Sequence, residues 1–177
     1  CNIVLADLSR TSETCSILCS ELLDLKGSQG GGINLQHFNV TDFAQVVGAV
    51  SKTIDLFGRI DVLVNNAGIM PDSQSGFMKP LVKLDLGHVD VMSFMRKVME
   101  VNFWGTFYMC NQVLKHMQTA GYGRIINISS IAAHSGEEKN HVYAASKAAV
   151  ESLTMALAAK EAQFVKGDSM AANDITV

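Results

Sequence analysis

Short apolar runs alternate with longer helical patterns along almost the whole chain, and this alternation constrains the fold more than any other feature. The runs have the length of strands, whereas the segments between them carry apolar residues at the three- and four-residue spacing of an amphipathic helix. Strands separated by helices indicate βαβ crossovers, which make the strands parallel. The predicted strands are residues 2–7, 33–40, 59–68, 123–130 and 174–177.

The helices between these strands are predicted at residues 12–26, 41–58, 89–119 and 142–165. Thr41 is expected to cap the second of them. Because the strands are apolar throughout, we expect both faces of the sheet to be covered. The sequence therefore predicts one α/β domain over residues 1–177, with a doubly wound, Rossmann-like parallel sheet.

Composition excludes several classes of function. The chain has 177 residues, of which 48% are apolar and 18% charged, and its net charge is −3. Such a chain has no basic surface for nucleic acid or an anionic membrane, and no apolar stretch is long enough to span one. The cysteines in "TCSILC" lack a second cluster that would complete a metal site. We expect reduced thiols, no metal and a cytoplasmic protein.

Polar residues stand where several predicted strands stop, which is where open α/β sheets bind ligands. Asp7 ends "VLAD"; its carboxylate can accept hydrogen bonds from the hydroxyls of an adenosine ribose, or cap the next helix. The "NNAG" at 65–68 is either an ordinary turn or a place where a flat ligand meets the backbone. Ser130 closes "RIINISS" and can donate to a substrate oxygen. Ser129 is expected to point to the opposite side.

Tyr143 and Lys147 stand four residues apart in the last predicted helix, so their Cβ atoms lie about 5–6 Å apart on one face. An ordinary surface pair is the alternative. A free tyrosine has a pKa of about 10, and a neighbouring cation lowers such a pKa by roughly 1–3 units. Tyr143 could then exchange a proton with an alcohol or a ketone near neutral pH. The small residues Ala144, Ala145 and Ser146 would keep the helix surface low around the pair.

Taken together, these motifs resemble the short-chain dehydrogenase/reductase family. The spacing of the motifs also fits, and the resemblance covers residues 1 to about 160. It implies an NAD(P)-dependent oxidoreductase that interconverts a secondary alcohol and a ketone of a small-molecule substrate by hydride transfer. The matching stretches are "VLAD" with Asp7, "NVTD" at 39–42, "DVLVNNAG" at 61–68, "VNFWGTF" with Asn102, "GRIINISS" with Ser130, and "YAASK" with Tyr143 and Lys147.

The resemblance implies catalytic roles for four residues. Tyr143 is the general acid/base, and Lys147 tunes it and holds the nicotinamide ribose. Ser130 orients the substrate oxygen, and Asn102 supports a water chain that relays the proton.

The resemblance also implies the cofactor site. The family more often has Asp at position 39, although the Asn39 carbonyl can still accept from the adenine amino group. Asp7 favours NAD over NADP because a carboxylate repels a 2′-phosphate. Arg10 keeps NADP possible. The predicted cofactor-binding residues are Asp7, Asn39, Val40, Asn66, Ala67, Gly68, Tyr143 and Lys147.

Two parts of the family pattern are missing, so the sheet is expected to be incomplete at both ends. No glycine-rich G-x-x-x-G-x-G turn precedes Asp7, and the sequence stops within the strand at 174–177. The family's first strand would lie between the strands at 2–7 and 60–65, which leaves a predicted gap of about 9.6 Å. We expect a piece with two such edges to be unstable or aggregated and to bind NAD poorly.

Quaternary structure and alternative functions also follow from these patterns. Family members often dimerise through the two long helices, so a homodimer or homotetramer is expected for the intact protein. A dimerisation or binding module without catalysis stays open, as does a sugar-nucleotide epimerase with the same Tyr–Lys pair. A hydrolase built on Ser130 and His134 is disfavoured because no G-x-S-x-G motif is present.

Overall fold

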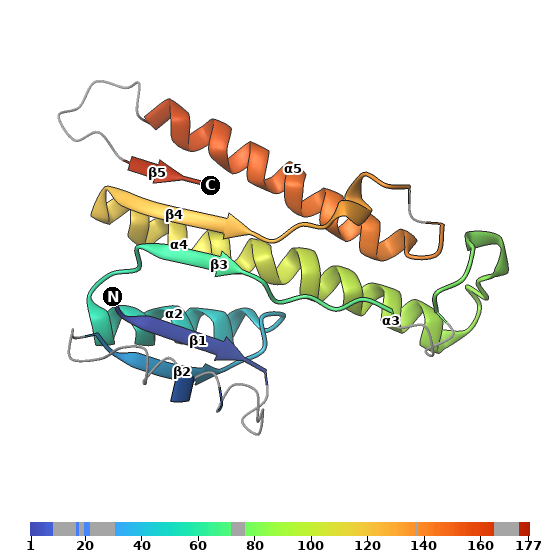
Figure 1. The fold of residues 1–177 in the computed structure, drawn as a ribbon, viewed down its shortest axis with the longest axis horizontal. Coiled ribbons are helices and arrows are strands. Elements are labelled where there is room, and N and C mark those ends of the chain that lie inside the picture. The colour runs from blue at the N-terminus through green and yellow to red at the C-terminus, as the bar shows by residue number, and fades with distance from the viewer. Residues whose placement is uncertain (9–16, 18–19, 22–30, 72–76, 137, 165–173) are drawn as a thin grey trace.

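The computed structural model describes residues 1–8, 17, 20, 21, 31–71, 77–136, 138–164 and 174–177. Every predicted strand is present within two or three residues of its expected bounds (Figure 1). The helix predicted at 12–26 lies mostly outside the described residues. The strands are β1 (Ile3–Asp7), β2 (Ile33–His37), β3 (Val62–Asn65), β4 (Tyr122–Asn127) and β5 (Asp174–Thr176), and the main helices are α2 (Phe43–Phe57), α3 (Val89–Met99), α4 (Thr106–Ala120) and α5 (His141–Phe164).

The strands form two parallel sheets instead of one. β1 pairs with β2, with Ile3 opposite Ile33, and the second sheet has the order β3–β4–β5, with Leu63 opposite Ile125. Among the described residues, no strand joins β1 to β3 (Figure 1). The predicted gap between these two strands is therefore present.

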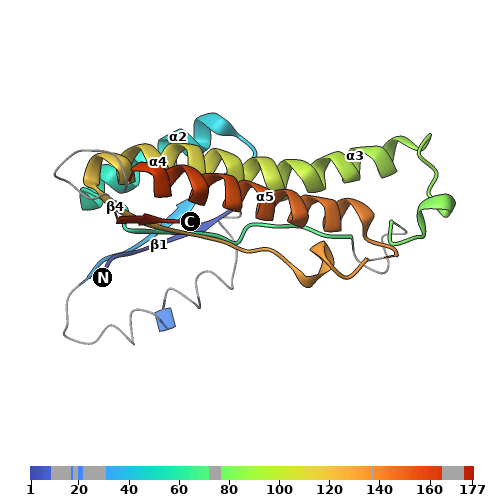
Figure 2. The same cartoon turned by 90° about the horizontal axis from the view of Figure 1, so that it is seen from above.

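Helices α2, α3, α4 and α5 lie along one face of the strands (Figure 2). In β3, Val62 and Val64 are 52% and 53% exposed, whereas Leu63 and Asn65, which alternate with them, are buried. The prediction that the strands are buried on both faces is thus wrong for β3. The reason is that α4 packs on only one side of this strand, so the pleat alternates between a covered and an uncovered face.

The hydrophobic core lies between α4 and the three-stranded sheet, with α2 packed beside α4. Gly123 of β4 allows this close approach, because a Cβ at that position would overlap the side chain of Met117. β5 is fastened to β4 by Arg124, which donates to both carboxylate oxygens of Asp174 at 2.8 Å. The buried core residues are Val50, Leu63, Cys110, Val113, Leu114, Met117, Ile125 and Ile175.

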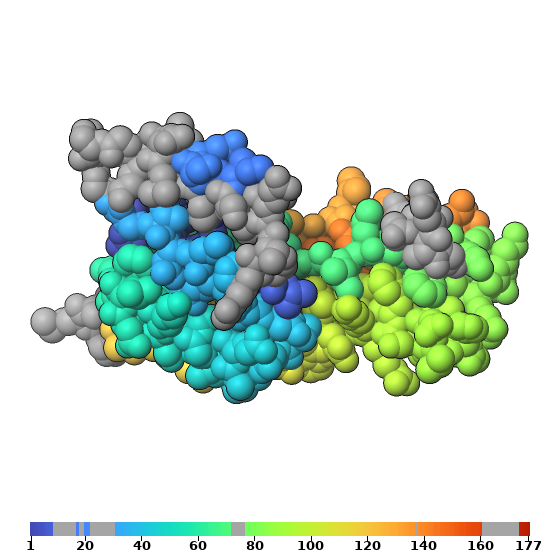
Figure 3. All heavy atoms as spheres, turned by 90° about the horizontal axis from the view of Figure 1, so that it is seen from below, coloured from blue at the N-terminus to red at the C-terminus, as the bar shows by residue number. Residues whose placement is uncertain are grey.

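β2 is connected to α2 by a turn that the sequence only partly predicted. Asp42, and not Thr41, caps α2, with its Oδ1 accepting from the amides of Ala44 and Gln45 at 3.0 and 3.2 Å. Thr41 instead donates its hydroxyl to Asn39. Both residue types suit an N-cap, so only the backbone geometry decides between neighbours. Figure 3 shows α2 and β2 at one end of the molecule and α3 at the other.

The helix predicted at 89–119 is one long rod with a π-helical segment at Glu100–Gly105 in its middle. The part before this segment, α3, packs against α5, whereas the part after it, α4, packs against α2 and the sheet. Side-chain spacing predicted the rod but not the wide turn within it, which occupies only 6 residues. Such turns are frequent at functional sites.

Within the described ranges, no helix combines the length and hydropathy of a membrane span. Nor do three His, Cys, Asp or Glu side chains gather there as a metal site would require. The single domain and the cytoplasmic location stay predictions.

Candidate active site

The end of β3, the π-helical segment and α5 meet at one point. A Cβ added to Gly68 would lie 3.4 Å from Asn102 Oδ1 and 3.5 Å from Lys147 Nζ. The backbone after β3 therefore runs directly beside two of the predicted catalytic side chains. Three segments that are distant in sequence converge here.

Lys147 is held by the end of β4 and lies close to Tyr143. Its Nζ donates to the carbonyl oxygen of Ile128 at 2.7 Å and lies 5.9 Å from the centroid of the Tyr143 ring. The residue is only 5% exposed, and this burial lowers the pKa of the ammonium group. Sequence reasoning missed Ile128, because a backbone acceptor leaves no signal in residue type.

Asn102 is 1% exposed, and both the oxygen and the nitrogen of its side-chain amide are hydrogen-bonded within the protein. Its Oδ1 accepts from the amide of Ile69 at 2.8 Å, and its Nδ2 donates to the carbonyl of Ile69 at 2.9 Å. The same Nδ2 donates to Ser146 Oγ at 3.0 Å. The side chain thus clamps the loop that follows Gly68 and ties it to α5.

Ser146 has a different place from the one predicted. Its side chain is 0% exposed, and Oγ donates to the carbonyl oxygen of Tyr143 at 2.7 Å. The prediction that Ser146 lies at the surface beside the Tyr–Lys pair is therefore wrong, whereas Ala145 is exposed. Ser146 stands three residues after Tyr143, so its hydroxyl reaches back one turn along the helix.

Ser129 and Ser130 have different partners, as alternation along an extended strand predicts. Ser130 is the N-cap of a short 3₁₀ turn, Ile131–Ala133, and its Oγ accepts from the amide of Ala132 at 3.2 Å. This uses one acceptor site of the hydroxyl. Ser129 Oγ instead donates to Glu151 at 2.6 Å, and the same carboxylate pairs with His134 at 3.0 Å.

The predicted adenine-side residues lie at the ends of β1 and β2. Asp7 is the last residue of β1, opposite His37, while Arg10 lies outside the described residues. Asn39 Oδ1, the predicted acceptor for adenine, accepts from the amide and the hydroxyl of Thr41 at 3.0 and 2.9 Å. Val40 touches the π-helical segment, since a Cβ on Gly105 would lie 2.7 Å from Val40 Cγ2.

The residues present fit the two riboses and the ring of a nicotinamide dinucleotide. Asn66, Ala67 and Gly68 are exposed, and Gly68 offers bare backbone within reach of the Lys147 ammonium. Asp7 offers a carboxylate at the end of a neighbouring parallel strand pair. Among the described residues, no glycine-rich turn opens a helix where a pyrophosphate would bind.

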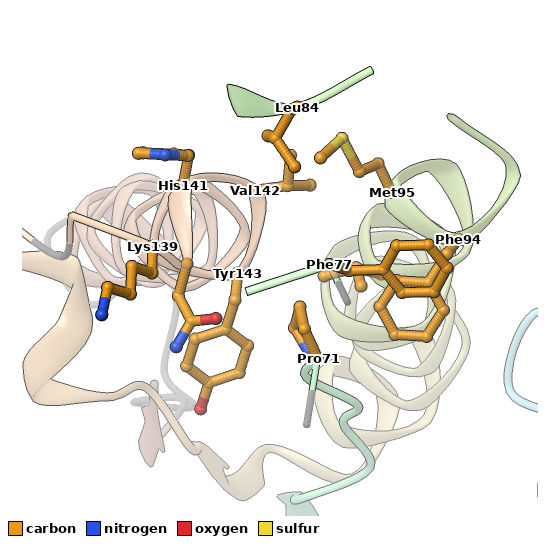
Figure 4. A pocket seen from close by; sticks show the side chains of 11 residues that line it. Pro71, Phe77, Leu84, Phe94, Met95, Lys139, His141, Val142 and Tyr143 are labelled. Atoms are coloured by element: carbon orange, nitrogen blue, oxygen red, sulfur yellow. The ribbon is translucent and has the colours of Figure 1, made fainter. Parts of the chain in front are cut away.

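A small pocket lies beside Tyr143, between α3 and the beginning of α5, and most of its lining is apolar (Figure 4). Phe77 and Phe94 stack there with ring centroids 4.9 Å apart. In Figure 4 these two rings and the ring of Tyr143 lie on opposite sides of Pro71. Tyr143 therefore has an apolar neighbourhood on the side that faces α3.

The parallel strands, the crossover helices and the polar residues at the strand ends define a Rossmann-like α/β protein. The family profile described as short chain dehydrogenase matches residues 2–169. The chain belongs to the short-chain dehydrogenase family.

Individual relatives and solved structures agree with this assignment. The chain is 39% identical over 120 residues to 2-(R)-hydroxypropyl-CoM dehydrogenase of Xanthobacter autotrophicus, a match that covers 68% of this chain and 44% of that protein. A structure of NAD⁺-bound xylitol dehydrogenase has a TM-score of 0.77 at 26% identity and covers 99% of this chain and 58% of that one. Gluconate 5-dehydrogenase from Burkholderia cenocepacia, in complex with NADP and tartrate, has a TM-score of 0.72 at 29% identity and covers 98% and 57%. The chain spans about half the length of the curated relatives it matches.

Proposed function

We propose that the protein is an NAD(P)-dependent oxidoreductase that interconverts a secondary alcohol and a ketone. The observation that carries this proposal is the position of Lys147, whose ammonium is anchored on Ile128, lies 5.9 Å from the centroid of the Tyr143 ring and is close to Gly68. A purely structural role for Lys147 would not require it to be buried close to both the Tyr143 phenol and the exposed backbone at Gly68. The dehydrogenase relatives support the same reaction class.

In the proposed reaction Tyr143 moves the proton. In the oxidative direction its phenolate takes the proton of the alcohol, and in the reductive direction its hydroxyl returns a proton to the carbonyl oxygen. The bound dinucleotide supplies the hydride chemistry, for which no side chain is suited. Lys147 favours the phenolate by its charge and would bind the nicotinamide ribose.

Ser130 and Asn102 would serve the substrate and the proton path. The hydroxyl of Ser130 can donate to the substrate oxygen while its oxygen caps the turn at Ala132. Both amide hydrogens of Asn102 are donated within the protein, so a water that donates to this residue would bind its backbone carbonyl or the second acceptor site of Oδ1.

For the cofactor we propose NAD in preference to NADP, with Asp7, Asn39 and Val40 on the adenosine side and Asn66, Ala67 and Gly68 on the nicotinamide side. Asp7 supports this preference, because its carboxylate would repel a 2′-phosphate. The ratio of kcat/KM for NAD to that for NADP should exceed one. Replacing Asp7 by Ser should lower this ratio, and a ratio that does not change would contradict the assignment.

We also propose that the intact protein is a homodimer or homotetramer. Apolar side chains stand exposed on the long rod and on α5, with Trp104 43%, Phe107 37% and Met155 66% exposed. Large exposed apolar side chains on neighbouring helices are typical of interfaces. Sedimentation of the full-length protein tests the state directly, and a monomer at micromolar concentration would exclude it.

The central experiment follows absorbance at 340 nm with the protein from its complete coding sequence and a panel of secondary alcohols. Tyr143→Phe should abolish hydride transfer, because a phenyl ring cannot carry the proton. Tyr122→Phe is the matched control: Tyr122 lies at the opposite end of β4, where its ring contacts Arg124 with the guanidinium carbon 4.8 Å from the ring centroid. Equal activity in wild type and Tyr143→Phe would refute the proposed function.

A further inference from the structure

Ser146 links two of the proposed catalytic residues, a role that its residue type alone does not indicate. Its hydroxyl has one hydrogen to donate and two acceptor sites. The hydrogen goes to the carbonyl oxygen of Tyr143 at 2.7 Å, and one acceptor site takes a hydrogen from Asn102 Nδ2 at 3.0 Å. Because the side chain is 0% exposed, water cannot replace either contact without rearrangement.

Asn102 in turn connects Ser146 to the backbone that follows Gly68 at the proposed site. Asn102 holds both the amide and the carbonyl of Ile69, at 2.8 and 2.9 Å. Ile69 follows Gly68, and Gly68 lies beside the ammonium of Lys147. Ser146 therefore lies at the junction of α5, which carries the proton-transferring side chain, and the loop against which a flat ring would lie.

We propose that Ser146 is a positioning residue for the reaction, acting through Asn102 to fix the distance between the loop at Gly68 and the Tyr143–Lys147 pair. This rests on the proposed function. Without the hydroxyl, one hydrogen of the Asn102 amide would be left buried and unsatisfied, so the amide would shift to find another partner. The loop at Ile69 would shift with it. A misplacement of about 1 Å costs on the order of a hundredfold in rate.

The molecule contains a matched control for this contact. Thr154, two turns further along α5, donates its hydroxyl to the carbonyl of Val150 at 2.8 Å and accepts from the side-chain amide of Asn127 at 2.9 Å. The bonding pattern is the same, a helix hydroxyl that reaches back one turn and receives an asparagine amide. Asn127, however, ties β4 to β3 within the core, and its side chain bonds Asn65 and Thr154 instead of a proposed catalytic residue.

The test compares Ser146→Ala with Thr154→Val in the full-length protein, with thermal unfolding measured for both. We expect comparable losses of unfolding temperature. With an alcohol that the wild type oxidises, Ser146→Ala should lower kcat at least about tenfold while the KM for the alcohol changes less than threefold. Thr154→Val should change both by less than twofold. If kcat of Ser146→Ala stays within twofold, or if Thr154→Val loses as much, the proposal is overturned.

A second measurement separates this proposal from the proposed function. Hydrogen exchange at the amide of Ile69 should become faster in Ser146→Ala and not in Thr154→Val, whether or not any alcohol is oxidised. An unchanged rate at Ile69 overturns the positioning chain. If that rate rises but no alcohol and no dinucleotide give a signal at 340 nm in the wild type, the proposed function fails instead. Should Ser146→Ala not fold, Ser146→Cys, which is nearly isosteric and a weaker hydrogen-bonding group, should show the same directions with smaller losses.

Discussion

The two sheets of this molecule are held in very different ways. The three-stranded sheet is packed on α4 and is fastened by side chains, with Asn65 Nδ2 donating to Asn127 Oδ1 at 2.9 Å and to Cys110 Sγ at 3.3 Å. Among the described residues, a side-chain bond from Gln36 Nε2 to Thr53 Oγ1 at 3.0 Å joins the two-stranded sheet of β1 and β2 to α2, and most residues of these two strands are half-buried.

The two sheets carry different parts of the proposed function. The residues proposed for proton transfer are attached to the well-packed sheet through Ile128, Ile69 and the core. Asp7, proposed to bind the adenosine ribose, stands on the weakly attached pair. The proposed chemistry and the proposed cofactor affinity should therefore respond to different substitutions, and the following predictions test that separation.

The largest effect is expected from Lys147→Met. This change removes both the ammonium beside Tyr143 and the bond to Ile128, so kcat/KM should fall by about a thousandfold, within the range for lost acid–base catalysis. Steady-state kinetics at 340 nm measure it. Lys160→Met, an exposed lysine on the same helix, serves as the control and should change kcat/KM less than twofold. A small loss with Lys147→Met would show that the buried ammonium is structural only.

The next effect concerns stability. Asn65→Leu leaves Asn127 Oδ1 with only the long contact from Cys110 Sγ at 3.7 Å and should lower the free energy of unfolding by about 2–3 kcal/mol in urea titrations. Gln36→Leu removes a buried amide with a single partner from the two-stranded sheet and should cost less than about 1 kcal/mol. Equal losses would mean that both sheets unfold as one cooperative unit.

Alkaline pH should weaken the three-stranded sheet. Burial raises the pKa of the Cys110 thiol to about 11 from an ordinary value of 9.0. Because the pKa of this thiol is raised in the folded protein, its full contribution to stability is present below pH 9. That contribution is lost as pH rises through 11. At pH 10.5 the loss should reach about 2 kcal/mol.

Lys147 has the opposite effect on stability. Its pKa is lowered in the folded protein, so the free energy of unfolding rises as pH rises toward the ordinary lysine pKa of 10.5. Cys110→Ala isolates the thiol. The decrease in unfolding temperature between pH 8 and pH 10.5 should be smaller in Cys110→Ala than in the wild type. The same decrease in both proteins would exclude the thiol as its source.

The smallest effect is expected at the contact between the π-helical segment and the loop that follows β2. Gly105→Ala places a methyl group 2.7 Å from Val40 Cγ2, and because Val40 follows β2, the adenine-side loop must move to make room. The KM for NAD should rise up to about fivefold, a cost of at most about 1 kcal/mol. The kcat should stay within twofold, and a larger fall in kcat would show that the displacement spreads along the π-helical segment to Asn102.

Sequence patterns predicted the strands, the long helices and the proximity of Tyr143 to Lys147, because apolar spacing and helical period are local properties. They also predicted the gap between β1 and β3. They did not predict the uncovered face of β3, since an apolar residue looks the same in the sequence whether or not a helix lies over it.

Within the site, the missed features are contacts between segments that are distant in the chain. Ile128 acts through its backbone, so its side chain carries no signal. Ser146 is one small residue among several, and only the position of Asn102 distinguishes it from Ala145. Asp42 and Thr41 are both good caps, and the turn at Asn39 decides which is used.

The wide turn at Glu100–Gly105 has a consequence for how this long rod can vary. An ordinary α-helix advances 100° per residue, so adding or deleting one residue between α3 and α4 would rotate one half of the rod by that angle relative to the other. Val113 and Met117 would then swing away from the strands that they now cover. The length of this stretch should therefore be fixed even where its side chains are free to differ.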